Sequence, residues 1–151
     1  MGPTIDWVVL ATGDRDDDLV AALNSLATHL QPGERVHLVL NGAGLTPPGP
    51  SRLEHAVADA LHVIHAGENL GIPGGRNVGA AASEADVVAF LDDDAVVRSD
   101  DMGRQLRDRF AADARLGGVS FRIVDPNSGA TAQRHVPRPG GAGLEREGEV
   151  T

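Results

Sequence analysis

Three consecutive aspartates, Asp92, Asp93 and Asp94, follow an apolar, β-branched run at residues 87–91. A run of this kind is typical of a buried strand, which would deliver the three carboxylates to the loop at its end. Neighbouring carboxylates repel one another unless a positive charge lies among them. Their hard oxygen atoms suit Mg²⁺ or Mn²⁺, ions that proteins often hold together with a phosphate group. The aspartates therefore predict a divalent-cation site for a phosphate-bearing ligand.

The elements that would position these aspartates alternate between strand and helix patterns. Apolar runs predict strands at residues 5–12, 36–40, 61–65 and 87–91. Between and after them, helical spacing and cap residues predict helices at residues 16–30, at residues 51–60, before Ser83 and after Ser99. A last strand is predicted at residues 119–124, ending in a turn at residues 125–129. This alternation predicts an α/β fold with a mostly parallel sheet and helices on both faces.

Ligands of such sheets bind where the strands end, so the loop after each predicted strand is a candidate part of the site. Each of these loops carries glycine or polar residues: Thr12, Gly13, Asp14 and Arg15 after the first strand; Asn41 and Gly42 after the second; the glycine-rich stretch with Gly71, Arg76 and Asn77 after the third; and Asp92, Asp93 and Asp94 after the fourth. The convergence of these loops indicates a nucleotide-sized ligand.

Composition narrows the classes of partner. The formal net charge is −9, so a nucleic-acid backbone or an anionic membrane surface would be repelled. All 13 basic side chains are arginines, and there is no cysteine. Schiff-base chemistry and thiolate metal sites are thereby excluded. No apolar run approaches the roughly 20 residues of a membrane span, and the first residues lack the pattern of a signal peptide, so a cytoplasmic chain is expected.

Four segments together resemble the family 2 glycosyltransferases. They are Val-Leu-Ala-Thr-Gly-Asp-Arg, Leu-Val-Leu-Asn-Gly, Glu-Asn-Leu-Gly-Ile-Pro-Gly-Gly-Arg-Asn-Val-Gly and Ala-Phe-Leu-Asp-Asp-Asp, in the order that the family uses, within residues 5–125. The resemblance implies a GT-A fold, which is a Rossmann-like, three-layer α/β/α arrangement. It also implies an inverting transfer from a nucleotide-diphospho-sugar (UDP-, GDP- or dTDP-sugar) and a Mg²⁺ or Mn²⁺ ion held against the diphosphate.

The resemblance also implies roles for individual residues. Asp94 would be the main metal ligand, with Asp92 as a second ligand, while Asp92 and Asp93 would lie near the ribose and the sugar. The other donor-binding residues would be Thr12, Asp14, Arg15 and Asn41 around the base, and Gly71, Arg76 and Asn77 over the nucleotide and its phosphates. Two positions depart from the family pattern: Gly13 replaces an aromatic residue and Leu40 replaces an acidic one.

Family members ordinarily continue into a segment that binds the acceptor and supplies the general base, and this sequence offers no such segment. The remaining carboxylates of Asp125, Glu145, Glu147 and Glu149 lie in a predicted turn or tail, so none is nominated as the base. We expect a donor-binding domain at residues 1–136 and a flexible tail or link at residues 137–151. The chain would then be a donor-binding half, completed by a missing part, by another chain or by a second copy of itself.

The aspartates are also compatible with two other functions. A haloacid-dehalogenase-like phosphatase would use Asp92 as nucleophile and Asp94 as acid/base. That motif normally begins its domain, and the phosphate-holding lysine is missing from this chain. The second alternative is a module that binds a nucleotide sugar without catalysis. The histidines show no ligand spacing in the sequence, and His62 and His65 are predicted to have structural or surface roles.

Overall fold

The computed structural model describes residues 2–131, which belong to two compact units divided between Ala114 and Arg115. The helices and strands of the described residues all lie in the first unit. The predicted tail at residues 137–151 lies outside the described residues.

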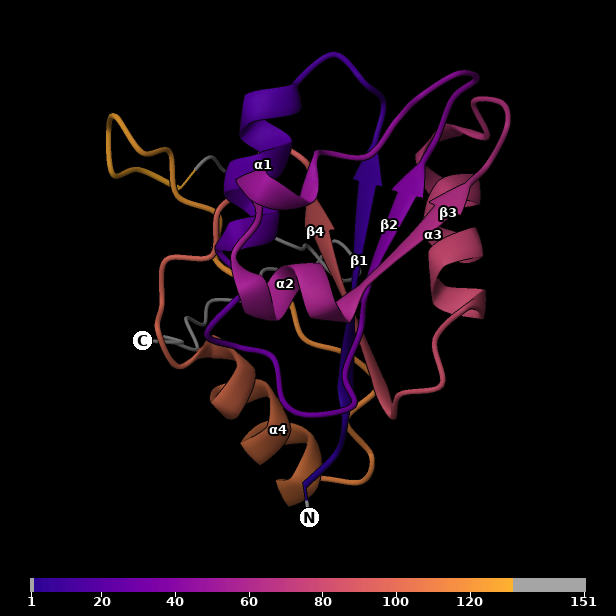
Figure 1. Cartoon of the computed structure of the whole chain (residues 1–151). Helices are drawn as coiled ribbons and strands as arrows, with labels where there is room; N and C mark the ends of the chain where they lie inside the picture. The colour runs from indigo at the N-terminus through magenta and orange to yellow at the C-terminus, as the bar shows by residue number, and fades with distance from the viewer. Residues whose placement is uncertain (1, 132–151) are drawn as a thin grey trace, which may run out of the picture. The chain divides into compact units, whose positions relative to one another are not determined.

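The first unit is built on a parallel sheet of four strands, β1 (Ile5–Ala11), β2 (Val36–Leu40), β3 (Leu61–His65) and β4 (Val87–Asp92). Their order across the sheet is β3-β2-β1-β4 (Figure 1). The chain adds β2 and β3 on one side of β1 and then returns to place β4 on the other side. This reversal puts the topological switch point of the sheet, where α/β proteins bind ligands, between β1 and β4.

Helices cover both faces of this sheet, which confirms the predicted α/β arrangement. They are α1 (Asp16–Asn24), α2 (His55–Ala60), α3 (Gly71–Ala81) and α4 (Met102–Ala112), with a short 3-10 helix η1 (Pro50–Arg52) before α2. Figure 1 shows α3 on one side of the sheet and α1 and α4 on the other. Right-handed crossovers explain this placement, because the connection through α3 runs across the sheet in the opposite direction to the earlier ones.

The core follows from the central position of β1, whose seven residues are all buried. Val8 and Leu10 point toward α3, where they form an apolar cluster with Val39 of β2. The other face of the sheet is closed by buried residues of α1, α2 and α4, including Leu23, Val57 and Leu106.

Four local predictions need correction. The first helix ends at Asn24 rather than near residue 30, and the segment predicted as one helix at residues 51–60 is two short helices, because Leu53 and Glu54 between them are extended. The glycine-rich stretch is part of α3 rather than a loop. No strand forms at residues 119–124 in the described part of the chain. The apolar side chains of Ile123 and Val124 there are 49% and 44% exposed, so this segment lacks the buried face that stabilises a strand.

Gly79 shows why a helix can be rich in glycine. A Cβ atom at this position would lie 2.4 Å from Cγ1 of Val8 and 3.0 Å from Cγ2 of Val39, both stiff, buried side chains. We therefore expect Gly79→Ala to lower the free energy of unfolding by about 1–3 kcal/mol through overpacking, although alanine favours helix. Urea unfolding would measure the loss. Gly49→Ala is the control, since its nearest contact would be 4.0 Å away and its φ of −61° suits alanine. Equal stability of the two variants would contradict the prediction.

Candidate donor-binding site

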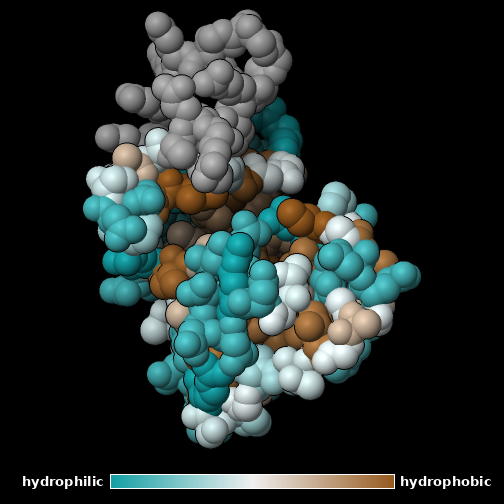
Figure 2. All heavy atoms as spheres, turned by 90° about the horizontal axis from the view of Figure 1, so that it is seen from above, coloured by the Kyte–Doolittle hydropathy of each residue, from teal (hydrophilic) through white to brown (hydrophobic). Residues whose placement is uncertain are grey.

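The candidate site lies where β1 and β4 end, at the switch point of the sheet. β1 is followed by residues 12–15, and β4 ends at Asp92 and is followed directly by Asp93 and Asp94. Figure 2 looks down on this end of the sheet, and hydrophilic residues cover much of the surface in that view. The fold thus brings together the first and fourth of the loops that the sequence singled out.

Asp92 pairs with an arginine of α3. It is the register partner of Leu10, whose side chain faces α3, so Asp92 is directed to the same side of the sheet. Nη2 of Arg76 lies 2.6 Å from Oδ1 of Asp92, and the guanidinium group also lies over the ring of Phe90, 5.6 Å from its centroid. The Asp92 side chain remains 58% exposed, so one of its oxygens is open to a ligand.

Asp94 pairs with the other candidate arginine. Nη1 of Arg15 lies 2.5 Å from Oδ2 of Asp94 and 3.6 Å from Oδ1 of Asp93. The side chains of Arg15 and Asp94 are 47% and 51% exposed, respectively, so solvent screens this pair and a ligand can reach both groups. Asp92 and Asp94 are thus accessible carboxylates that are each balanced by an arginine.

Asp93 is buried between the two loops, unlike its neighbours. It is 8% exposed, and it accepts a hydrogen bond from the backbone N–H of Thr12, which links the end of β4 to the end of β1. Burial raises the pKa of the Asp93 carboxyl, and the hydrogen bond from Thr12 and the charge of Arg15 only partly oppose this rise. This environment makes Asp93 a structural connector as well as a candidate donor contact.

Thr12 and Asp14 form a small polar group beside Arg15. The Thr12 hydroxyl donates to Oδ1 of Asp14 over 2.9 Å, and this hydrogen bond lowers the pKa of the Asp14 carboxyl. Between them, Gly13 has a φ of +93°, and a Cβ atom there would lie 2.3 Å from Cδ2 of Leu45. This backbone conformation and the contact with Leu45 explain why no aromatic side chain occupies position 13.

Asn41 holds the beginning of α3 in place. It is 2% exposed; its Oδ1 accepts the backbone N–H of Leu70 over 2.9 Å, and its Nδ2 donates to the carbonyl of Gly71 over 3.3 Å. Asn69 completes the arrangement by accepting from both Nδ2 of Asn41 and the backbone N–H of Gly71. The structure therefore gives Asn41 a positioning role, while direct contact with a base stays a prediction.

Asn77 stands apart from the other candidates. It is exposed on α3, and within residues 2–131 no hydrogen bond or ion pair joins it to them. Two contributors, Asn69 and Phe90, were missed by sequence reasoning. Both lie in segments that carried the family resemblance, but only the folded chain shows that Asn69 braces the start of α3 and that Phe90 supports Arg76.

The fit of a metal ion depends on Asp92 and Asp94. The described part of the chain holds no preformed group of three or more His, Cys, Asp or Glu side chains that could bind a metal. Mg²⁺, however, is commonly held by one or two carboxylates together with substrate phosphates and water. Two accessible carboxylates at the switch point fit an ion that arrives with a diphosphate, rather than one bound permanently by the protein.

A parallel α/β sheet with polar loops and carboxylates at its switch point is the Rossmann-like arrangement that the sequence predicted. The chain belongs to Glycosyl transferase family 2, the family description that it matches over residues 7–146. The family match agrees with the resemblance read from the sequence and disfavours the phosphatase alternative. Comparison with curated protein sequences gave no match.

A solved structure supports the fold, and a related complex is also similar. The crystal structure of S. aureus TarS 1–349 is 20% identical with a TM-score of 0.54, and the match covers 71% of this chain and 32% of that one. The complex of TarS 1–349 with UDP-GlcNAc is 23% identical with a TM-score of 0.49, and it covers 72% and 30% of the two chains. The chain thus spans about a third of the length of TarS 1–349. In addition, none of the helices within residues 2–131 is long and apolar enough to cross a membrane.

Asp93→Asn is expected to stabilise the ligand-free protein at neutral pH. Because the pKa of Asp93 is raised in the folded state, its contribution to stability is greatest at low pH and is lost as the pH rises through the folded pKa. Removing the charge should raise the free energy of unfolding at pH 7 by up to about 1 kcal/mol, and by less as the pH is lowered. Urea unfolding at several pH values measures this effect. Asp94→Asn, at an exposed position, is the control and should change stability little; a destabilised Asp93→Asn protein would contradict the prediction.

Proposed function

We propose that this chain is the donor-binding part of an inverting, metal-dependent glycosyltransferase that uses a nucleotide-diphospho-sugar. The observation that carries the proposal is the pair of accessible carboxylate–arginine contacts, Asp92 with Arg76 and Asp94 with Arg15, at the switch point of a family 2 domain. A metal–diphosphate unit would need carboxylates for the ion and cations for the phosphates. The two pairs supply two groups of each kind.

In this proposal, Asp94 and Asp92 would hold Mg²⁺ or Mn²⁺, which would supply positive charge beside the diphosphate leaving group. Arg15 and Arg76 exchange their carboxylate partners for phosphate oxygens when the donor binds, because a guanidinium group binds either anion through the same N–H donors. Both arginine side chains are partly exposed, so this exchange requires only side-chain rotation.

The remaining predicted contacts surround the nucleotide. Thr12 and Asp14 offer a hydroxyl and a carboxylate for the base, and Asp93 keeps the two loops together so that these groups stay in place. Asn41 positions the start of α3 at Gly71 through its hydrogen bonds. Helix α3 in turn carries Arg76 and Asn77.

Inversion needs a base on the opposite face of the sugar to deprotonate the acceptor. Asp125 is a poor candidate, because hydrogen bonds from the backbone N–H groups of Ser128 and Asn127 and from the Ser128 hydroxyl lower the pKa of its carboxyl. Glu145, Glu147 and Glu149 lie outside the described residues. We propose that the base and the acceptor site come from a further segment or from a partner chain.

Calorimetry with UDP, GDP and dTDP, each with Mn²⁺ and with EDTA, tests the proposal, and UDP-GlcNAc adds a complete nucleotide sugar. One diphosphate should bind at least about 10-fold more tightly with Mn²⁺, and its monophosphate should lose most of this gain. Failure of all three to bind, or equal binding in EDTA, would overturn the proposal. Release of free nucleoside diphosphate from the bound sugar nucleotide separates an enzyme from a binding module without turnover.

A further inference from the structure

A second polar site lies at the opposite end of the sheet from the candidate donor site. An open cavity of about 580 Å³ lies beside the beginnings of β1, β2 and β3, on the face that α3 covers. Its lining includes the side chains of Asp6, Arg35, His37, His62 and Glu84. The donor-binding proposal uses none of these residues.

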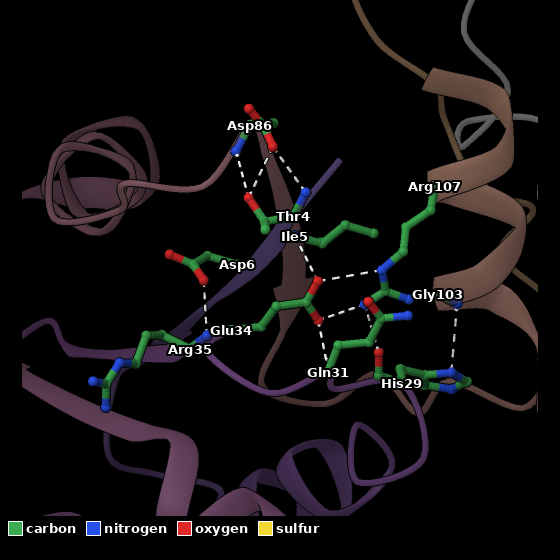
Figure 3. Close-up of polar contacts among 10 residues, drawn as sticks. All are labelled: Thr4, Ile5, Asp6, His29, Gln31, Glu34, Arg35, Asp86, Gly103 and Arg107. Carbon is green, nitrogen blue, oxygen red and sulfur yellow. Dashed lines mark hydrogen bonds and ion pairs between the residues drawn. The ribbon is translucent and has the colours of Figure 1, made fainter. Parts of the chain in front are cut away.

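Asp6 organises this site. Its side chain is 6% exposed, and its carboxylate accepts hydrogen bonds from the backbone N–H of Arg35 (2.7 Å), the hydroxyl of Ser83 (2.7 Å) and Nε2 of His37 (3.0 Å). Figure 3 shows Asp6 with the Arg35 amide. Burial alone would raise the pKa of Asp6, but the hydrogen bonds from His37, Ser83 and Arg35 outweigh burial and lower it. The carboxylate is therefore ionised at neutral pH and only accepts hydrogen bonds.

This acceptor fixes the orientation of the His37 ring. Because Asp6 can only accept, Nε2 of His37 must carry the proton of their hydrogen bond, and Nδ1 is the ring nitrogen that faces His62. Nδ1 of His37 lies 3.0 Å from Nδ1 of His62. The two histidines are register partners on β2 and β3, so the sheet itself holds the two nitrogens together.

We propose that His37 and His62 form a site for one divalent transition-metal ion, with Zn²⁺ as the reference ion and Asp6 as the supporting carboxylate. Two nitrogen ligands at about 2.0–2.1 Å from one ion lie about 2.8–3.4 Å apart for bond angles between roughly 90° and tetrahedral. A carboxylate behind the first histidine, which fixes its tautomer and raises its basicity, is the usual support of a metal-bound imidazole.

The location supports metal entry. The His37 side chain is 3% exposed, whereas His62 is exposed at the mouth of the cavity, so an ion would reach the pair from the solvent side. Water in the cavity would complete the coordination. Because the ligands come from two neighbouring strands, a bound ion would join β2 to β3 and raise the unfolding temperature as its concentration increases.

The test uses tag-free protein that has been treated with EDTA and then titrated with ZnCl₂ and NiCl₂ in a calorimeter. The Asp92→Asn/Asp94→Asn double variant serves as the background, so that the candidate donor site does not contribute. We expect one equivalent of Zn²⁺ to bind, and His62→Gln to weaken binding by at least about 10-fold. His65→Gln is the matched control: it removes an exposed histidine from the same strand, on the other face, and should leave binding unchanged.

Thermal unfolding gives an independent measurement on the same proteins. Zn²⁺ should raise the unfolding temperature of the background variant and of His65→Gln but not that of His62→Gln. The unfolding transition also shows that each variant is folded. Absence of Zn²⁺ and Ni²⁺ binding in the background protein, or unchanged binding in His62→Gln, would overturn the proposal and leave the contact as a hydrogen bond between two imidazoles.

Discussion

Asp94→Asn should weaken the Mn²⁺-dependent binding of the nucleoside diphosphate by about 100-fold, which corresponds to about 2.7 kcal/mol. An amide retains one oxygen but loses the negative charge that a hard divalent ion requires, and of the two proposed ligands only the Asp92 carboxylate then remains. Calorimetry with and without EDTA measures the effect. Binding in EDTA should change much less, because the contacts with the base do not depend on Asp94.

The matched control for Asp94→Asn is Asp17→Asn. Asp17 also pairs with an arginine, Arg52, at 2.6 Å and is 97% exposed, so the change in charge is the same at a position outside the proposed site. Equal loss of affinity in both variants would indicate a general effect of protein charge. Full Mn²⁺-dependent affinity in Asp94→Asn would refute the assignment of Asp94 as a metal ligand.

Substitution of Arg15 tests the Arg15–Asp94 contact through its positively charged partner. Its guanidinium group occupies one oxygen of Asp94 in the ligand-free protein, so it competes with a metal ion that binds alone. Arg15→Gln should therefore strengthen the binding of Mn²⁺ alone while weakening that of the Mn²⁺–diphosphate complex. A variant in which both affinities fall together would indicate that Arg15 only supports the loop.

The sequence predicted the strands well because each is a short apolar run between polar or glycine-rich segments. β2 and β3 have the predicted bounds, and β1 ends one residue earlier than predicted. The start of α3 was predicted as loop because glycine is a poor helix former. In the folded chain, Gly75 and Gly79 are needed in α3 so that the helix can approach Leu10 and Val8 of β1. Tertiary packing thus outweighs local propensity there.

The candidate site was predictable to the extent that it depends on topology. Parallel strands bring their final loops to one edge, so the proximity of Arg15 to Asp94 follows from the strand pattern. The pairing of His37 with His62 depends on register across 25 residues, which no local pattern reveals. The burial of Asp93 between two exposed neighbours likewise depends on the loop that follows β1.

Another long-range contact that the sequence did not reveal is expected to contribute most to stability. Glu34, just before β2, pairs with Arg107 of α4, and the two side chains are 1% and 9% exposed. Figure 3 shows the Glu34 carboxylate among its donors, which are the Arg107 guanidinium group and the backbone N–H groups of Ile5 and Gln31. Nη2 of Arg107 also donates to the carbonyl of His29 over 3.0 Å. Each charge is buried, paired with the other and further satisfied by backbone groups.

Arg107→Met should therefore lower the free energy of unfolding by about 3–5 kcal/mol, because it leaves the Glu34 carboxylate buried without a countercharge. Urea unfolding at pH 7 measures the loss. The double variant Glu34→Gln/Arg107→Met should recover part of it, since glutamine carries no charge while its amide oxygen can still accept from the backbone N–H groups that the carboxylate serves. Arg104→Met is the control on the same helix: its pairs with Asp101 and Asp108 are exposed, so little stability should be lost. If Arg107→Met were no less stable than Arg104→Met, the buried pair would not be what anchors α4 to the sheet.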